Sequence, residues 1–216
     1  MISENFRLNQ DPETNINSAE RVEKFEKIKT PEELMLFMKN NIKYGFIGEK
    51  DGKIYSPEQE NWGIGEQPAT KLQSPEEILK SGYGTCWEQT ELEKQWFAKN
   101  NFEFKTLLLM FGKNINQQNP AHTILTYKKD NKWCWLENTL DGHNGIDEFD
   151  NQHDLIEHVK GILINNALNS GATENDIKEY KVYDYDVSAY GCSIDKFIEQ
   201  IKTNGELQGK IINQKK

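Results

Sequence analysis

The sequence predicts an α+β protein in which helices come first, antiparallel strands follow, and one more strand and helix come last. Three observations carry this prediction. The helix-start pattern Ser/Thr-Pro-Glu-Glu occurs at residues 30–33 and again at 74–77. Strand-like segments then follow one another from residue 102 to about residue 150 without a helix between them. Because helices and strands are segregated, the pattern indicates an α+β fold and not repeated β/α units.

The N-terminal third of the chain is expected to form helices and loops. Ser18 can cap a helix through residues 19–28, and Thr30 caps a second helix in a capping-box arrangement. Residues 44–73 are rich in Gly, Pro, Asn and Asp. This composition favours loops, with a short hairpin around Asp51-Gly52.

Residues 74–216 are expected to form the core, on which residues 1–73 pack within a single domain. A short helix ends at Gly82, and a longer helix begins at Thr85 or Cys86. The spacing of apolar residues and turn signals gives the other elements: strands at 102–111, 122–127, 133–137 and 178–186, and helices at 153–166 and 193–202.

The composition argues against several classes of protein. With 216 residues, five Trp, eight Tyr and ten Phe, the chain can bury a sizeable core. Its net charge of −9 disfavours binding to nucleic acid or anionic membranes. No segment approaches the roughly 20 apolar residues of a membrane span, and no signal-peptide pattern opens the chain. We therefore expect a cytoplasmic protein that binds neither nucleic acid nor membranes.

Cysteine usage argues against a disulfide framework or a cysteine-based zinc site. The three cysteines, Cys86, Cys134 and Cys192, form no C-x-x-C pair. We expect no metal and no cofactor. Cys134 is expected to be a buried core residue. Cys192 lies close to an expected helix N-terminus and is a rival nucleophile, but no histidine lies near it in the sequence.

Cys86 is the main candidate for a nucleophile. It follows Gly84-Thr85 and lies in the first turn of the longer helix, where unpaired backbone N–H groups stabilise a thiolate. The same N–H groups can bind the oxyanion that forms when a carbonyl is attacked. Gly82 and Gly84 allow backbone and substrate to come close together. The alternative is that Cys86 is an inert, buried apolar side chain.

A nucleophilic cysteine needs a base, and His122 is the best placed of the four histidines. It begins an alternating strand, from which its ring can project at the sheet edge. His143 lies in a Gly/Asn turn. His153 and His158 lie on an expected helix, and their spacing of five does not suit a two-histidine metal site.

A third group is needed to orient the base, and the strand that follows His122 offers two candidates. With a two-residue turn at Lys129-Asp130, Glu137 lies directly opposite His122. With a two-residue turn at Asp130-Asn131, Glu137 lies diagonal to His122 on the same face. A three-residue turn instead places Asn138 opposite His122. Glu137 is favoured because Asp-Asn suits a two-residue turn.

Three short motifs in this order resemble the transglutaminase-like cysteine superfamily: YGTCW at 83–87, Ala121-His122, and WLENT at 135–139. The match covers residues 74–150. The resemblance implies a papain-like arrangement, in which the helix of the cysteine packs on an antiparallel sheet. It also implies that Cys86 is the nucleophile, His122 the base and Glu137 the orienting acid.

The motifs depart from the family pattern at two positions. Glu137 stands where the family has aspartate, and Asn138 stands where it has proline. Because glutamate is one methylene longer, either the His122 ring lies farther back or Asn138 takes the orienting role. The family also supplies an oxyanion donor from a side chain that precedes the cysteine. Trp62 and Tyr83 are candidates for it, although Trp62 also suits an anchoring role in its loop, and Trp87 lies directly beside Cys86.

The resemblance implies acyl transfer from a protein, peptide or amide substrate through a thioester on Cys86. With water as the acceptor the enzyme is a protease or amidase, and with an amine it is a crosslinking transglutaminase. Two other hypotheses remain. One is a noncatalytic binding module that keeps this fold, and the other is a papain-like peptidase of another branch in which Asn138 orients the base.

Overall fold

The computed structural model describes residues 17–59, 69–111, 121–188 and 190–212. Its centre is a six-stranded antiparallel sheet with the strand order β10-β9-β5-β6-β7-β8. The strands are β5 (Phe104–Phe111), β6 (Ala121–Lys129), β7 (Lys132–Glu137), β8 (Gly145–Phe149), β9 (Glu179–Tyr185) and β10 (Glu206–Ile212). The prediction of an α+β protein with an antiparallel sheet is therefore confirmed.

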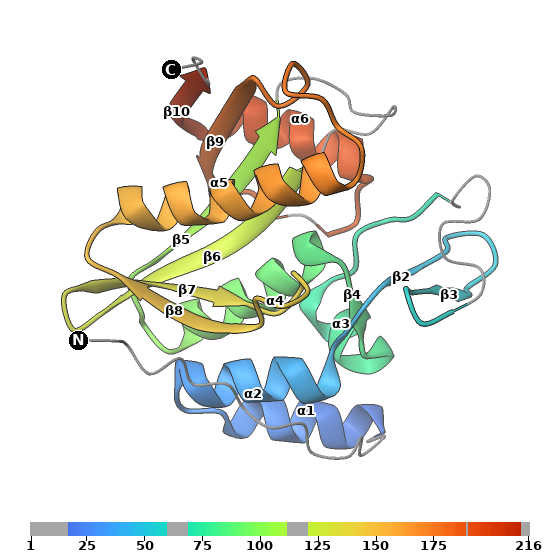
Figure 1. Cartoon of the computed structure of the whole chain (residues 1–216). Coiled ribbons are helices and arrows are strands. Elements are labelled where there is room, and N and C mark those ends of the chain that lie inside the picture. Colours follow the sequence, from blue (N-terminus) through green and yellow to red (C-terminus); the bar gives the residue numbers. More distant parts are fainter. Residues whose placement is uncertain (1–16, 60–68, 112–120, 189, 213–216) are drawn as a thin grey trace.

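Six helices are described, and both faces of this sheet carry helices (Figure 1): α5 packs on one face and α2, α4 and α6 on the other. They are α1 (Ser18–Lys27), α2 (Pro31–Asn41), α3 (Pro75–Ser81), α4 (Cys86–Lys99), α5 (Gln152–Asn169) and α6 (Ile194–Asn204). Alternation along β5 separates the two faces. Leu107 and Leu109 pack in the same apolar cluster as Leu155 of α5. Leu108 packs in the cluster that holds Trp87 of α4 and Phe197 of α6.

Four short strands join the N-terminal part to the core. They are β1 (Lys43–Tyr44), β2 (Phe46–Ile47), β3 (Ile54–Tyr55) and β4 (Tyr83–Gly84). β2 and β3 form the hairpin that the sequence predicts around Asp51-Gly52, and Gly52 has a φ of 63°. β1 pairs in parallel with β4, directly before α4. This pairing fixes the backbone that leads into the helix of Cys86.

The helix ends follow the capping signals of the sequence. Thr30 and Ser74 both form capping boxes, with Glu33 and Glu77 respectively. Gly82 ends α3 in the left-handed conformation, with a φ of 75°.

The prediction of Ser18 as the first cap is wrong by one residue. Asn17 is the cap, and its side-chain oxygen accepts a hydrogen bond from the backbone N–H of Glu20 at 3.0 Å. Asn is as good a cap as Ser, so the helix begins with Ser18 itself.

The last strand and some element ends differ from prediction. The sequence does not predict β10. Its segment contains a glycine, which weakens the local strand signal, and the strand is held by pairing with β9. Helix α5 runs to Asn169, past the predicted end at residue 166. Within the described residues, no helix has both the length and the apolar character needed to cross a membrane.

Candidate active site

The N-terminus of α4 carries Cys86 and is fixed by a buried glutamate. Glu88 lies in the same first turn and is fully buried. Its Oε2 accepts hydrogen bonds from the backbone N–H of Thr85 at 2.7 Å and from the Thr85 hydroxyl at 2.9 Å. Its Oε1 accepts from the backbone N–H of Gln73 at 2.9 Å. Cys86 is thereby held at a helix start whose position is determined by residues on both sides of α3.

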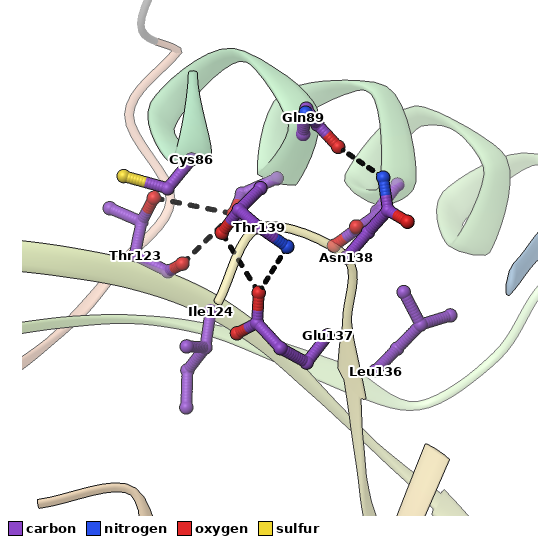
Figure 2. A pocket seen from close by; sticks show the side chains of 10 residues that line it. Cys86, Gln89, Thr123, Ile124, Leu136, Glu137, Asn138 and Thr139 are labelled. Atoms are coloured by element: carbon purple, nitrogen blue, oxygen red, sulfur yellow. Dashed lines mark hydrogen bonds between the residues drawn. The ribbon is translucent and has the colours of Figure 1, made fainter. Parts of the chain in front are cut away.

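His122 and Glu137 form a buried pair beside this helix. His122 Nε2 lies 2.8 Å from Glu137 Oε2, and both side chains are almost inaccessible to solvent. The other carboxylate oxygen of Glu137 accepts from the backbone N–H of Thr139 at 2.6 Å and from its hydroxyl at 2.8 Å (Figure 2). The same oxygen also accepts from the N–H of Leu140 at 3.0 Å. Glu137 is therefore held in one orientation, and it fixes the ring of His122.

The β6–β7 hairpin has one of the three registers considered from the sequence. Asp130 and Asn131 form the two-residue turn, with φ values of 51° and 64°, and Lys129 pairs with Lys132. Such left-handed values are typical of the tight turns that join two strands, and Asp and Asn tolerate them. In this register Glu137 lies diagonal to His122 on the same face, which gives the longer glutamate the reach it needs.

Asn138 forms no hydrogen bond with His122 in the structure. Its side-chain amide donates a hydrogen bond to Gln89 Oε1 at 2.7 Å (Figure 2). Gln89 in turn donates to the carbonyl of Gly84 at 2.8 Å. Asn138 and Gln89 therefore tie the end of β7 to the start of α4. The ring of His122 instead donates its hydrogen bond to Glu137.

The charges of the site favour a protonated His122. Burial alone would lower the pKa of His122, but the negative charge of Glu137 and the hydrogen bonds to Cys86 and Glu137 raise it to about 10. Burial would raise the pKa of Glu137, but the charge of His122 and its hydrogen bond lower it below its usual range. Because Glu137 occupies Nε2, Nδ1 is the ring nitrogen left for the thiol of Cys86.

The other two cysteines lie in less reactive surroundings. Burial raises the pKa of Cys134 to about 11, in agreement with the prediction of a buried core residue. Burial also raises the pKa of Cys192, which is half-buried. A raised pKa leaves less thiolate at neutral pH, so both thiols are poorer nucleophiles.

The remaining residues that the sequence analysis named for the site are Trp87, Tyr83 and Trp62. Trp87 is buried in the core, where its ring meets that of Phe197 edge to face with centroids 5.7 Å apart. The carbonyl of Tyr83 accepts from Gln73 Nε2 at 3.0 Å, and its strand leads into α4. Trp62 lies outside the described residues.

Tyr44 is a site residue that the sequence analysis missed. Burial raises its pKa, and so do the charges of Cys86, Glu88 and Glu137, which places its side chain near all three. The pairing of β1 with β4 brings it there. No local signal marks residue 44, because its place depends on a contact with a strand about forty residues later.

A small cavity of about 10 Å³ lies between α4 and the hairpin strands, and Cys86 is part of its lining. This is the scale at which a single water molecule fits. Most of its lining is polar, and it comes from three elements: Cys86, Gln89, Thr90 and Glu93 of α4, Thr123 and Ile124 of β6, and residues 136–139 at the end of β7. The members from α4 recur at helical spacing from Cys86, which is the signal that could have identified Gln89 and Glu93.

The comparisons with known proteins leave the family open. No family model matches the chain, and no curated protein matches it. Among the described residues, no group of three or more His, Cys, Asp and Glu side chains is placed to hold a metal ion.

Proposed function

We propose that the chain is a cysteine-dependent acyltransferase or amide hydrolase of the transglutaminase-like kind. One observation carries the proposal: the buried pair of His122 and Glu137, joined at 2.8 Å, acts electrostatically on Cys86 at the first turn of a helix. A nucleophile, a base and an orienting acid in this order are what thiol acyl transfer requires.

In the first step, the Cys86 thiolate attacks the carbonyl carbon of an amide, and a new S–C bond forms. The backbone N–H groups at the start of α4 stabilise the negative charge on the carbonyl oxygen, and Tyr44 is a candidate for a further donor. His122 gives its Nδ1 proton to the departing amine as the C–N bond breaks. A thioester on Cys86 remains.

In the second step, His122 accepts a proton from the acceptor, which attacks the thioester carbonyl. The S–C bond breaks, and the thiolate and the imidazolium are restored. Water as the acceptor gives an acid, and a primary amine gives a new amide.

The arrangement of the elements supports a papain-like core as the setting for this chemistry. The helix of Cys86 precedes three antiparallel strands in the chain, packs against β5 and β6, and meets His122 on β6 and Glu137 on the end of β7. The transglutaminase-like motifs fall on these same elements, in the same order.

A noncatalytic binding module is the second candidate, and the burial of the site favours it. Cys86 is 6% exposed and His122 is 4% exposed, so little of either side chain is accessible to a substrate. The fully formed Cys86–His122–Glu137 arrangement favours catalysis.

Alkylation kinetics test the proposal first. Native protein is treated with iodoacetamide across a range of pH, and labelling of each cysteine is measured by mass spectrometry. We expect Cys86 to label faster than Cys134 and Cys192 at about pH 6, where an ordinary thiol is protonated. We expect His122→Ala to remove this advantage. Labelling of Cys86 no faster than that of the other two would contradict the proposal and favour the binding module.

Trapping of the thioester then identifies the reaction. The protein is mixed with amide and peptide libraries, quenched in acid and weighed intact, with Cys86→Ala as the control. An acyl adduct that disappears faster when a primary amine is added indicates an amine acceptor. An adduct whose loss does not respond to the amine indicates hydrolysis.

A further inference from the structure

Glu93 is a buried acid in the site that the proposed mechanism does not use. It lies on α4, seven residues after Cys86 and so on the same helix face, and it lines the same cavity as Cys86 and Glu137. Glu93 is 4% exposed. Within the described part of the chain, no residue forms a hydrogen bond with its carboxyl group, although a buried carboxylate normally needs such partners.

The charges around Glu93 are mostly negative. Cys86 faces it from its own helix, His122 from β6 and Glu137 from β7, and the neutral phenol of Tyr185 faces it from β9. Of the described groups that act on it, only His122 is positive, and Glu137 already forms an ion pair with that ring. A thiolate and two carboxylates would then share one imidazolium in a buried space, which is unfavourable.

We propose that Glu93 is a positioning residue that holds a proton near neutral pH and, by losing it at higher pH, keeps His122 protonated. Burial and the charge of Glu137 raise the pKa of Glu93 well above its usual range, in agreement with a neutral group. The role of this proton in catalysis rests on the proposed function, whereas its presence on Glu93 does not.

A protonated Glu93 can donate where a carboxylate cannot. Glu137 Oε1 accepts three hydrogen bonds, whereas Oε2 accepts the one from His122, so Oε2 has room for another donor. The cavity between the two acids is large enough for one bridging water molecule. Once Glu93 ionises, its negative charge stabilises the imidazolium of His122 and opposes release of the proton to a leaving group.

Infrared spectroscopy tests whether Glu93 carries the proton. The difference spectrum between the wild-type protein and Glu93→Gln, at neutral pH, is expected to show the carbonyl stretch of a protonated carboxylic acid. A difference spectrum with carboxylate stretches alone overturns the proposal.

Titration of the histidines by NMR tests whether this proton is coupled to His122, whose signal is assigned by its loss in His122→Gln. We expect His122 to release its proton at lower pH in Glu93→Gln, with a change of about tenfold in the proton-binding constant. Glu91→Gln is the matched control, because Glu91 is an equally buried glutamate of α4 that acts on Tyr185 and does not line the cavity. An equal midpoint in the wild-type protein and Glu93→Gln, or an equal shift in the control, overturns the coupling.

Glu93→Met guards against failure of the first variant to fold. Both variants replace a neutral side chain by a neutral one, so both are expected to fold at neutral pH. If both unfold there while Glu91→Gln folds, the fold requires a charged Glu93 and the proposal is wrong. Slow alkylation of Cys86 would instead contradict the proposed function, and the infrared and NMR results on Glu93 would not be affected.

Discussion

At the scale of single residues, the chemistry of the site depends on how completely Glu137 is held. Four hydrogen bonds reach its two oxygens, and one of them comes from His122. Because the pair is buried, its charges interact strongly, and removing either partner destabilises the folded protein. Glutamate at position 137 therefore reaches the ring of His122 and orients it in this geometry.

Removing the charge of Glu137 tests its role. In Glu137→Gln the imidazolium loses its counter-charge, so the pKa of His122 falls and less of the thiolate–imidazolium pair forms. We expect alkylation of Cys86 at about pH 6 to slow by roughly tenfold or more. Breaking the buried pair is also expected to lower the free energy of unfolding by about 3–5 kcal/mol, as measured in urea.

Asn138→Ala is the comparison for this variant. It removes the hydrogen bond to Gln89 and leaves the His122–Glu137 contact in place. We expect it to lower the free energy of unfolding by about 1–3 kcal/mol, with a smaller effect on alkylation than Glu137→Gln. A larger effect on alkylation from Asn138→Ala would assign the orienting role to Asn138.

At the scale of elements, α4 determines where Cys86, the proposed nucleophile, lies. Its N-terminus is anchored by Glu88, by the pairing of β1 with β4, and by the link from Gln89 to Asn138 at the end of β7. These contacts come from parts of the chain before and after the helix. The backbone N–H groups of the first turn are thereby held in place before a substrate binds, as an oxyanion site requires.

Substitution of Glu88 by Gln tests this anchoring. The amide can accept fewer of the hydrogen bonds from Thr85 and Gln73, so buried donors lose their partner. We expect the free energy of unfolding to fall by about 1–3 kcal/mol in urea and the alkylation of Cys86 to slow. Glu77→Gln alters the matching capping box of α3, which is exposed, and we expect about 0.5–1 kcal/mol with no change in alkylation. Equal effects from the two variants would contradict a special role for Glu88.

At the scale of the whole molecule, the buried pair links folding to pH. The pKa of His122 is raised from 6.5 to about 10. Its contribution to the free energy of unfolding is therefore fully present below about pH 6.5 and is lost as pH rises towards 10. The pKa of Glu137 is lowered, so its contribution is present above its usual value of 4.5 and is lost as pH falls through its lower folded value.

We therefore expect the free energy of unfolding to fall between about pH 6.5 and 10, by up to about 1.4 kcal/mol per pH unit for this proton. The raised pKa values of Glu88 and Glu93 act in the same direction, because a buried acid whose folded pKa lies above its unfolded value of about 4.5 lowers the free energy of unfolding as pH rises between the two values. Urea unfolding at a series of pH values measures this slope. Glu137→Gln is expected to show a shallower slope, and an unchanged slope would mean that the pair does not link folding to pH.

The sequence by itself determined features that depend on neighbouring residues. Capping boxes at Thr30 and Ser74 set two helix starts, and the Asp130-Asn131 turn sets the hairpin register, because each rests on hydrogen bonds and backbone angles within a few residues. Segregation of helices and strands likewise gave the α+β class. The same local patterns placed Cys86 at a helix start.

The tertiary structure alone decided which distant residues share the site. Tyr44 reaches it through pairing with β4, Glu93 through the packing of α4 on the hairpin, and Asn138 turns away from His122 towards Gln89. The edge strand β10 likewise depends on β9. Such contacts are set by burial and by pairing between segments far apart in the chain, and a local pattern contains neither.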